Sequence, residues 1–481
     1  MRNQGSGFVG RKTVGISRKG IKKAIDNGLS TRYASIMNPR PIGIDLFAGA
    51  GGMSLGFEQA GFDIVAAVEI DPVHCATHKF NFPHCAVMSR SVVGLTGAEI
   101  RMAAGLGSRR VDVLFGGAPC QGFSMIGQRA LDDPRNALVK DFLRIAHELD
   151  ASYFVFENVK GLTLGAHRKF LQEIEGLAGS YEYDILKPWQ VLDAADYGVP
   201  QHRERLFLFG AKRPRALPAY PVKSTRPADG KGKSTASEVG PTVRDAIGDL
   251  PDADRFDALL NTDELDGLAF GKPSDYAAEL RCLTNDAWHF GYVRNWRPSL
   301  LTSSTRTEHT EISRRRFAQT EGGNTEPISR FYKLKAQGLS NTLRAGTDGA
   351  RGAFTSPRPI HYQLPRCVTV REMARLHGYP DWFRFNETKW HGARQIGNSV
   401  PPPLARAVAG KVIDAIGWKR ARPEFPVDLG DPALLRMTVS QAAQFLNVPA
   451  PTMRRDKKSG AKKRKQHEIE AELELLSLAD G

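Results

Sequence analysis

The sequence predicts an α/β fold followed by a long irregular region. Between residues 42 and 209, short apolar runs alternate with longer amphipathic ones. From about residue 214 to 365 the periodicity is weak, and helical spacing returns over residues 369–418. Alternating strands and helices indicate a parallel sheet covered by helices. We therefore expect an α/β domain and a separate, irregular domain.

Five apolar runs that end in turn residues predict buried strands. They are IGIDLFAG (42–49), DIVAAVEID (63–71), VDVLFGGAP (111–119), ASYFVFENV (151–159) and RERLFLFGA (203–211). Helical spacing is found in MSLGFEQAGF (53–62), LVKDFLRIAHELD (138–150), TVREMARLHGYP (369–380) and PPPLARAVAGKVIDAIGW (401–418). In a parallel sheet, functional groups gather at the carboxyl ends of the strands. Glu69, Cys120 and Glu157 all fall at such ends.

The charge of the chain favours a polyanionic partner. The net charge is +15; residues 1–40 hold nine Lys and Arg against one Asp, and residues 454–465 hold eight against one. Flexible basic arms add salt-sensitive contacts to phosphates, although such tails can also serve solubility alone. No apolar run approaches the roughly 20 residues of a membrane span, and the N-terminus lacks the apolar stretch of a signal peptide. We expect a cytoplasmic, nucleoid-associated protein without a membrane partner.

The five cysteines are widely scattered and form no C-x-x-C pair. This argues against a disulfide framework and against a zinc site. Cys75 and Cys85 have histidines nearby, which we interpret as accidental, so we predict no metal. Cys120 differs because Pro119 fixes the backbone before it while Gly117 and Gly122 allow a ligand to approach closely. We therefore predict that Cys120 is a nucleophile.

A glycine-rich turn follows the first predicted strand, at Gly49 and Gly51. The dinucleotide fingerprint fails because Ser54 stands where its third glycine would be. Glu69 ends the next strand, 20 residues after Gly49, where a carboxylate can bind ribose hydroxyls. A ribose acid beside a turn that need not hold a pyrophosphate suits a nucleoside cofactor without phosphates, such as S-adenosylmethionine. A turn that serves packing alone is the alternative.

Three further charged residues, Glu157, Arg203 and Arg205, lie at the ends of predicted strands. Glu157 lies in FVFENV after an aromatic run, where an apolar wall raises the pKa of a carboxyl group and lets it donate a proton or a hydrogen bond. Arg203 and Arg205 lie two apart in QHRER and share one face if that stretch is extended. Such arginines can bind a phosphate, a carboxylate or a base edge.

Taken together, these motifs resemble those of bacterial DNA (cytosine-5)-methyltransferases. The resemblance covers about residues 42–418 and rests on DLFAGAGG, VEIDP, PCQGFS, ENV, QHRER, TVREMARLHGYP and QIGNSVPPPLA, in the family's order. It implies a Rossmann-like, S-adenosylmethionine-dependent methyltransferase sheet with a smaller target-recognition domain and a small helical C-terminal addition. The implied organisation is a basic arm (1–40), a catalytic and cofactor-binding domain (41–213), a recognition domain (214–365), a return to the catalytic domain (366–420) and an extension (421–481).

The resemblance also implies roles for individual residues. Cys120 would attack carbon 6 of a flipped-out cytosine in double-stranded DNA, and carbon 5 would take the methyl group. Glu157 would bind the ring nitrogen 3 edge, Arg203 would help to bind the base and Arg205 would support the site. The implied cofactor residues are Phe47, Gly49, Gly51, Glu69, Ile70 and Asn398.

Two parts of the chain match this pattern less closely. Ser91 stands where the family usually has an aspartate that contacts the adenine amino group, so the adenine contact there is in doubt. In the predicted recognition domain, arginines alternate with aromatic residues, as base-edge and phosphate contacts require. Arg306 and Arg314 are candidate DNA contacts, although charged loop residues are often only solvated.

The C-terminal extension allows two interpretations. Residues 437–460 resemble the start of a helix–turn–helix domain of the excisionase or MerR type, with Ala442, Ala443, Leu446 and Val448 in its core and Asn447 in the turn. The expected cap serine is replaced by Pro449-Ala450-Pro451, and a helical hairpin packed on the body fits equally well. HEIEAELELLSLA (467–479) predicts an amphipathic helix.

The sequence thus predicts a restriction–modification methyltransferase with a possible cognate restriction endonuclease acting on the same site. Two alternatives remain open. One is a tRNA cytosine-5 methyltransferase, against which the recognition region of about 150 residues and the basic arms argue. The other is a non-catalytic, sequence-specific DNA-binding protein on the same scaffold, against which Cys120, Glu157 and Arg203 argue.

Overall fold

The computed structural model describes residues 40–119, 137–163, 167–232, 234–347 and 355–451. Its centre is an eight-stranded sheet with the order β3-β2-β1-β4-β5-β8-β6, and β7 also pairs with β8. The strands are β1 (Ile42–Leu46), β2 (Asp63–Glu69), β3 (Ala86–Ser89), β4 (Val113–Gly116), β5 (Tyr153–Val159), β6 (Tyr183–Ile185), β7 (Gln190–Asp193) and β8 (Glu204–Lys212). The predicted α/β class is confirmed.

The sheet is parallel in one part and antiparallel in the other. β3, β2, β1, β4 and β5 run parallel, whereas β8 pairs antiparallel with β5, β6 and β7. The sequence predicted β8 as a buried strand, but a wholly parallel sheet was wrong. An apolar run does not encode the direction of its neighbour, because a buried strand is apolar on both faces in either arrangement.

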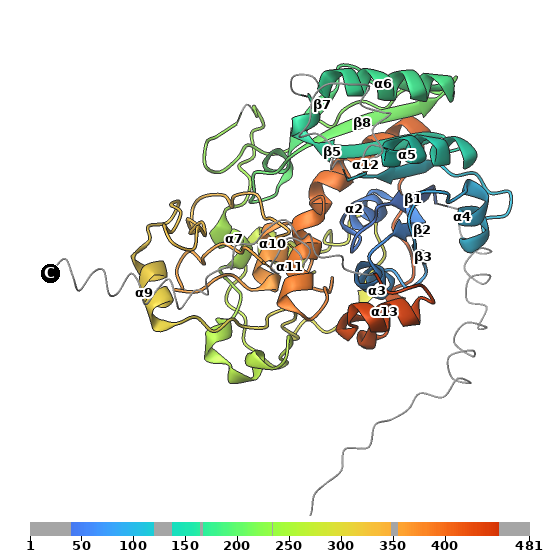
Figure 1. Cartoon of the computed structure of the whole chain (residues 1–481). Helices are drawn as coiled ribbons and strands as arrows, with labels where there is room; N and C mark the ends of the chain where they lie inside the picture. Colours follow the sequence, from blue (N-terminus) through green and yellow to red (C-terminus); the bar gives the residue numbers. More distant parts are fainter. Residues whose placement is uncertain (1–39, 120–136, 164–166, 233, 348–354, 452–481) are drawn as a thin grey trace, which may run out of the picture. The chain divides into compact units, whose positions relative to one another are not determined.

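Two hydrophobic layers cover the two faces of the sheet (Figure 1). Along β4 the side chains alternate, so that Val113 and Phe115 pack into one layer and Leu114 into the other. The first layer includes α2 (Gly52–Ala60) and α12 (Pro402–Ile416), and the second includes α4 (Gly97–Ala103), α5 (Ala137–Glu148) and α6 (His167–Ser180). The sheet is therefore the middle of three layers.

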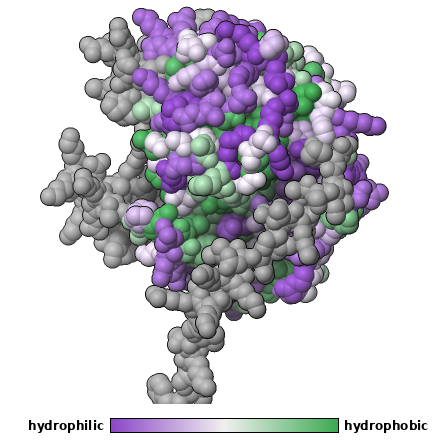
Figure 2. Space-filling model, turned by 90° about the vertical axis from the view of Figure 1, so that its right-hand side faces the viewer, coloured by the Kyte–Doolittle hydropathy of each residue, from purple (hydrophilic) through white to green (hydrophobic). Residues whose placement is uncertain are grey.

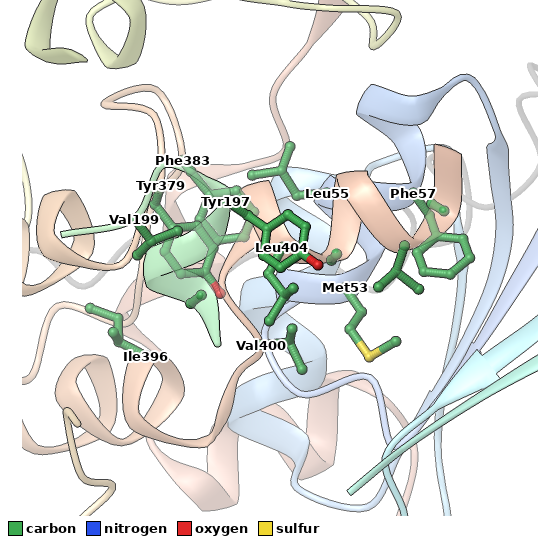
Figure 3. Packing of buried hydrophobic residues seen from close by; sticks show 14 of the residues in the cluster. Met53, Leu55, Phe57, Tyr197, Val199, Tyr379, Phe383, Ile396, Val400 and Leu404 are labelled. Carbon is green, nitrogen blue, oxygen red and sulfur yellow. The ribbon is translucent and has the colours of Figure 1, made fainter. Parts of the chain in front are cut away.

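Helices α2 and α12 come from opposite ends of the chain and pack closely together. A β-carbon on Gly56 would lie 2.4 Å from the β-carbon of Ala405 and 2.7 Å from the carbonyl oxygen of Pro402. Figure 3 shows Leu55 of α2 and Leu404 of α12 in one packed cluster. Residues of α12 share one hydrophobic layer with α2 and the sheet, and the domain boundaries at 366 and 420 stay a prediction.

The region after β8 is irregular, as the weak periodicity predicted. Its short elements are α7 (Val243–Ile247), α8 (Asp275–Leu280), β9 (Arg294–Asn295) and α9 (Glu311–Gln319), with 3₁₀ turns at Ala253–Arg255 and Asp257–Leu260. Small apolar clusters and buried ion pairs hold it together. Arg375, which no solvent reaches, places its guanidinium 2.5 Å from Asp381 and 3.2 Å from Asp249. Such a pair specifies an arrangement more than it stabilises the fold, but loss of one partner is costly.

The remaining helices complete the body and its extension. These are α3 (Pro72–Asn81), α10 (Val370–Leu376), α11 (Lys389–Asn398) and α13 (Val439–Phe445), with 3₁₀ turns at Lys160–Thr163, Ala194–Tyr197 and Pro432–Arg436 and the short strand β10 (Val427–Asp428). Helix α13 packs on α3, where Ala442 joins Val73, Ala76 and Phe80 in one cluster (Figure 1). The residues that would form a second helix after it, from 452 on, lie outside the described part, so the helix–turn–helix remains a prediction.

In the part of the chain that the structure describes, no helix is both long enough and apolar enough to span a membrane. On the face drawn in Figure 2, hydrophilic residues cover most of the visible surface and hydrophobic ones show toward its middle. The basic arm (1–39) and the tail (452–481) lie outside the described residues.

Candidate active site at the carboxyl edge of the sheet

The glycine-rich turn after β1 has a backbone that requires its glycines. Gly49 and Gly51 have φ values of +54° and +103°, a region that favours glycine. A β-carbon on Gly51 would lie 2.6 Å from the ring of Phe82, and one on Gly52 would lie 2.5 Å from the hydroxyl of Tyr379. Phe47, before the turn, also has a positive φ of +60°. The turn is therefore fixed by conformation and by close packing together.

The carboxylate of Glu69, at the end of β2, is hydrogen-bonded to the backbone of this turn. Its Oε2 accepts a hydrogen bond from the amide of Gly49 at 2.9 Å, and its Oε1 accepts one from the amide of Asp71 at 2.8 Å. Each carboxylate oxygen keeps a further lone pair for a ligand hydroxyl. The next residue, Ile70, is 67% exposed, an unusual position for an isoleucine and a suitable apolar surface for a flat ring.

Ser54, which replaces the third glycine of the fingerprint, has a structural partner that the sequence did not reveal. Its hydroxyl donates to Oδ2 of Asp45 at 2.7 Å and lies 3.0 Å from Nε2 of His78. All three side chains are buried. Burial raises the pKa of Asp45 to about 8 and lowers that of His78 to about 3. Asp45, Ser54 and His78 thus form a hydrogen-bonded network of uncharged side chains beneath the glycine-rich turn.

Ser91 lies two residues beyond β3, next to the end of β2. The amide of Arg90 donates to the carbonyl of Glu69 at 3.0 Å, which aligns the two strand ends. The hydroxyl of Ser91 accepts from the amide of Val93 at 3.1 Å. Ser91 therefore follows the residue that is hydrogen-bonded to Glu69, and its hydroxyl is engaged in a local turn. Its role toward a cofactor stays a prediction.

Glu157 and the chain before Cys120 meet where β4 and β5 lie side by side. A β-carbon on Gly117 would lie 2.2 Å from Oε2 of Glu157, so only glycine leaves room for this carboxylate. The neighbouring Asn158 donates from Nδ2 to the carbonyl of Ala118 at 3.1 Å. Cys120 itself lies outside the described residues. The chain is described up to Pro119, directly before it.

Arg205 is the partner of Glu157. Its Nε lies 2.8 Å from Oε1 of Glu157, with both side chains mostly shielded from solvent. The pairing of β5 with β8 produces this contact, because Val159 is opposite Arg205 and Glu157 is opposite Phe207. Burial raises the pKa of Glu157 above its usual range, and the positive charges of Arg205 and Arg203 oppose that rise.

Arg203 has a different position from the one predicted for a base-binding residue. Its side chain is 1% exposed, and its guanidinium donates to the carbonyl of Leu343 at 3.0 Å and to that of Gly397 at 2.7 Å. Burial lowers its pKa to about 9. Its Nε has no hydrogen-bond partner among the described residues. Arg203 links Leu343 to the last turn of α11, and Arg205 is the arginine that contacts Glu157.

A second buried network joins the same segments and was missed by sequence reasoning. The side-chain amide of Gln201 lies 2.9 Å from Nδ1 of His377, and Nε2 of His377 lies 3.1 Å from the hydroxyl of Ser399. Burial holds the pKa of His377 well below its usual range, so the ring is neutral. Gln201 lies in the QHRER motif and His377 lies in TVREMARLHGYP. The two residues are about 175 positions apart in sequence, so neither motif by itself shows that they interact. Asn398, the predicted cofactor residue next to Ser399, is exposed.

The two candidate DNA contacts are engaged inside the recognition region. Arg306 donates to Asp257 at 2.9 Å and to the carbonyl of Asp254 at 3.1 Å. Arg314 places its guanidinium 2.7 Å from the carboxylate of Asp254. Both arginines therefore stabilise loops, and a DNA contact by either would need to share or replace these partners.

The four described cysteines are poor nucleophiles. Cys75, Cys85, Cys282 and Cys367 form no disulfide with one another, and burial raises the pKa of each thiol. A thiol with a raised pKa contains little thiolate near neutrality. Within the described ranges, no three His, Cys, Asp or Glu side chains are grouped as a metal site would require.

The chain is similar to known proteins over most of its length. Residues 43–414 match the family model of C-5 cytosine-specific DNA methylases. The chain is 56% identical over 416 residues to the Type II methyltransferase M.XorII of Xanthomonas oryzae pv. oryzae, covering 86% of this chain and 95% of that protein. It is 31% identical over 438 residues to the Type II methyltransferase M.AgeI of Thalassovita gelatinovora, covering 78% and 99%.

A solved structure is similar over the same region. It is a crystal structure of a protein assigned as a prophage-encoded DNA modification methyltransferase (E. coli), with a TM-score of 0.60 and 32% identity. The match covers 79% of this chain and 100% of that one. The predicted class of fold is confirmed by this likeness.

Proposed function

This chain belongs to the C-5 cytosine-specific DNA methylase family, and from that premise we propose that it methylates cytosine through a covalent adduct on Cys120, with S-adenosylmethionine as donor. It is a DNA cytosine-5 methyltransferase of the type II restriction–modification kind. The donor, the adduct and the residue roles below are the proposed part. The target cytosine lies in a specific double-stranded sequence.

The residues at the ends of β1 and β2 suit a nucleoside donor. Glu69 is held by two backbone amides and has lone pairs left for ribose hydroxyls. Phe47 and the exposed Ile70 are placed to pack against a base. Gly49 and Gly51 let a ligand approach the backbone closely, and Ser91 and Asn398 border the same edge. S-adenosylmethionine, when bound, supplies an electrophilic methyl group.

The chain's own groups then carry out the chemistry on the ring. The thiolate of Cys120 bonds to carbon 6, and electrons move to carbon 5, which takes the methyl group. The proton on carbon 5 leaves to a base that we do not assign. The bond to sulfur then breaks, which restores the ring double bond and the thiolate. Nucleophilic catalysis of this kind divides one difficult step into easier ones.

Glu157 makes the ring susceptible to attack. Because its pKa is raised by burial, its carboxyl group can hold a proton on the side that faces nitrogen 3 and withdraw electrons from carbon 6. Arg205 orients this carboxyl group from the other side. The target atoms are shielded inside a duplex, so the base must be flipped out of the stack at a cost of a few kcal/mol.

The observation that carries this proposal is the contact of Glu157 with Gly117, three residues before Cys120. The test is a crosslink. 5-Fluorocytosine carries fluorine in place of the hydrogen on carbon 5, so no proton can leave after methyl transfer and the bond to sulfur cannot break. The enzyme incubated with DNA that has this base at the target site and with S-adenosylmethionine should therefore remain bound to the DNA in denaturant. Cys120→Ser should form no crosslink, whereas Cys282→Ser should crosslink like the unaltered enzyme.

Absence of the crosslink in the unaltered, DNA-binding enzyme would refute the covalent mechanism. Bisulfite sequencing of DNA from cells expressing the gene would identify the methylated sequence. The names of the relatives support a further proposal, that a cognate restriction endonuclease cuts the same site. Its test is whether DNA methylated by this enzyme resists cleavage in extracts of the source cells.

A further inference from the structure

A segment of the recognition region runs directly alongside the QHRER motif. The amide of Ser340 donates to the carbonyl of Pro200 at 2.8 Å, and the amide of His202 donates to the carbonyl of Ser340 at 3.2 Å. Next, the amide of Leu343 donates to Oε1 of Gln201 at 3.1 Å. The chain up to Leu343 therefore has a fixed register against the residues that precede Arg205.

The backbone at Arg344 is fixed to a second part of the site as well. Arg203 bonds to the carbonyl of Leu343, the peptide group just before Arg344. A β-carbon on Gly397 would lie 2.4 Å from the carbonyl carbon of Arg344 and 2.3 Å from the amide nitrogen of Ala345. Gly397 directly precedes Asn398. The main chain of Arg344 thus lies between the arginine motif and the segment that closes the cofactor site.

The far side of the segment is anchored too. Nε1 of Trp390 donates to the carbonyl of Thr347 at 3.1 Å. The amide of Thr355 donates to the same carbonyl at 3.0 Å. Gly346 has a φ of +74°, and a β-carbon there would lie 1.9 Å from the carbonyl oxygen of Thr355. Residues 340–347 are therefore held from both ends.

The side chain of Arg344 is not held by a carboxylate, unlike those of several other arginines in this region. It is exposed, and it makes no hydrogen bond or ion pair with any described residue. By contrast, Arg297 is paired with Asp266 at 2.7 Å, Arg306 with Asp257 and Arg314 with Asp254. A cation on a rigid backbone beside the catalytic groups, without a carboxylate partner, is available to a ligand.

We propose that Arg344 binds a DNA phosphate next to the target cytosine. This inference rests on the proposed function, because it takes the site near Glu157 as the place where the flipped cytosine is bound. When the base leaves the stack, its flanking phosphates stay on the strand at the mouth of the site. A guanidinium matches a phosphate with two parallel hydrogen bonds. Arg203 is excluded from this task because it is buried between two carbonyl groups.

The test is the salt dependence of DNA binding. Each phosphate contact adds close to one unit to the slope of log affinity against log salt. Arg344→Ala should reduce that slope by about 1 and weaken binding to cognate and unrelated duplexes equally, by roughly 5- to 10-fold at 0.1 M salt. Arg344→Lys should keep most of the slope. Arg109→Ala is the matched control, since Arg109 is exposed before β4, at the opposite edge of the sheet.

Each outcome bears on the proposal. An Arg344→Ala variant that binds like Arg109→Ala would overturn it. So would a loss of discrimination between cognate and unrelated duplexes, which would assign Arg344 to a base edge instead. Thermal melting of both variants checks that they are folded. The experiment uses no methyl transfer, so a failure of the crosslink in the unaltered enzyme would count against the proposed mechanism and leave the phosphate contact measurable.

Discussion

Gly117 lies so close to Glu157 that a β-carbon on it would be 2.2 Å from Oε2 of the carboxylate. That oxygen is at the end of a side chain, so a methyl group at residue 117 would push it aside and leave the backbone in place. Displacement of the carboxyl group would disturb its 2.8 Å contact with Arg205. Gly117 therefore matters for the position of Glu157, the carboxyl group for which we propose a catalytic role.

Gly117→Ala should lower kcat for methyl transfer by about 100-fold or more, because a shift of about 1 Å in a catalytic group costs that much. Its melting temperature should stay close to that of the unaltered enzyme. Gly161→Ala is the control, since nothing lies within 4 Å of a β-carbon there. Equal activity of the two variants would contradict the proposed role of Glu157.

Arg203 and Arg205 should separate stability from catalysis. Arg203→Ala leaves the buried carbonyls of Leu343 and Gly397 without a donor, and it should lower the free energy of unfolding by about 2–4 kcal/mol. Arg205→Ala should destabilise the protein less than Arg203→Ala, because Glu157, whose pKa is already raised by burial, can take up a proton when its partner is lost, but it should reduce kcat by roughly 100-fold. Denaturant unfolding and tritium transfer measure the two effects. The reverse pattern would restore the base-binding role to Arg203.

Ser54→Ala should destabilise the protein because Asp45 is buried and would lose its 2.7 Å donor. We expect a loss of about 1–3 kcal/mol in the free energy of unfolding. The pKa of Asp45 should rise further above 8, since the Ser54 hydrogen bond lowers it. Ser180→Ala, in the exposed last turn of α6, should have little effect. Equal unfolding curves for the two variants would show that the hydrogen-bonded network of Asp45, Ser54 and His78 does not contribute to stability.

His202 predicts a pH dependence of stability. Its ring lies 2.7 Å from Asp193 and 3.1 Å from Asp229, and the hydrogen bond to Asp193 is the main reason that its pKa rises to about 9. The folded protein holds this proton more tightly, so the stabilisation is complete below about pH 6.5 and is lost as the pH rises through 9. After solvent screening we expect about 1 kcal/mol.

The measurement is the free energy of unfolding between pH 6 and 9.5 for the unaltered protein and for His202→Gln. The difference between the two should shrink at high pH. A difference that stays constant over this range would show that the ring is not protonated in the folded state.

The strands and the order of the motifs could be predicted from the sequence because both are local patterns. The runs that became β1, β2, β4 and β5 were predicted from apolar residues and turn signals within a few positions. The distance of Glu69 from Gly49 in the sequence predicts that Glu69 is the ribose acid, and the structure places these two residues in direct hydrogen-bond contact.

Contacts between distant residues could not be read in the same way. In the sequence, Ser54 is visible only as a residue that replaces the third glycine of the fingerprint. Its partner His78 is 24 residues away, so the local pattern does not show their contact. The division of roles between Arg203 and Arg205 depends on Gly397, 194 residues after Arg203. The antiparallel direction of β8 and the internal partners of Arg306 and Arg314 also depend on the folded chain. These are properties of tertiary packing, which a local pattern does not record.

The packing of α2 against α12 has a consequence for the order of events during synthesis. A β-carbon on Gly52 would lie 2.8 Å from the carbonyl oxygen of Val400, and one on Gly56 would lie 2.4 Å from the β-carbon of Ala405, so the glycine-rich turn and α2 pack against residues that the ribosome adds late. A nascent chain released before that point would contain the strands of the sheet but would lack the helix that packs against the glycine-rich turn and α2.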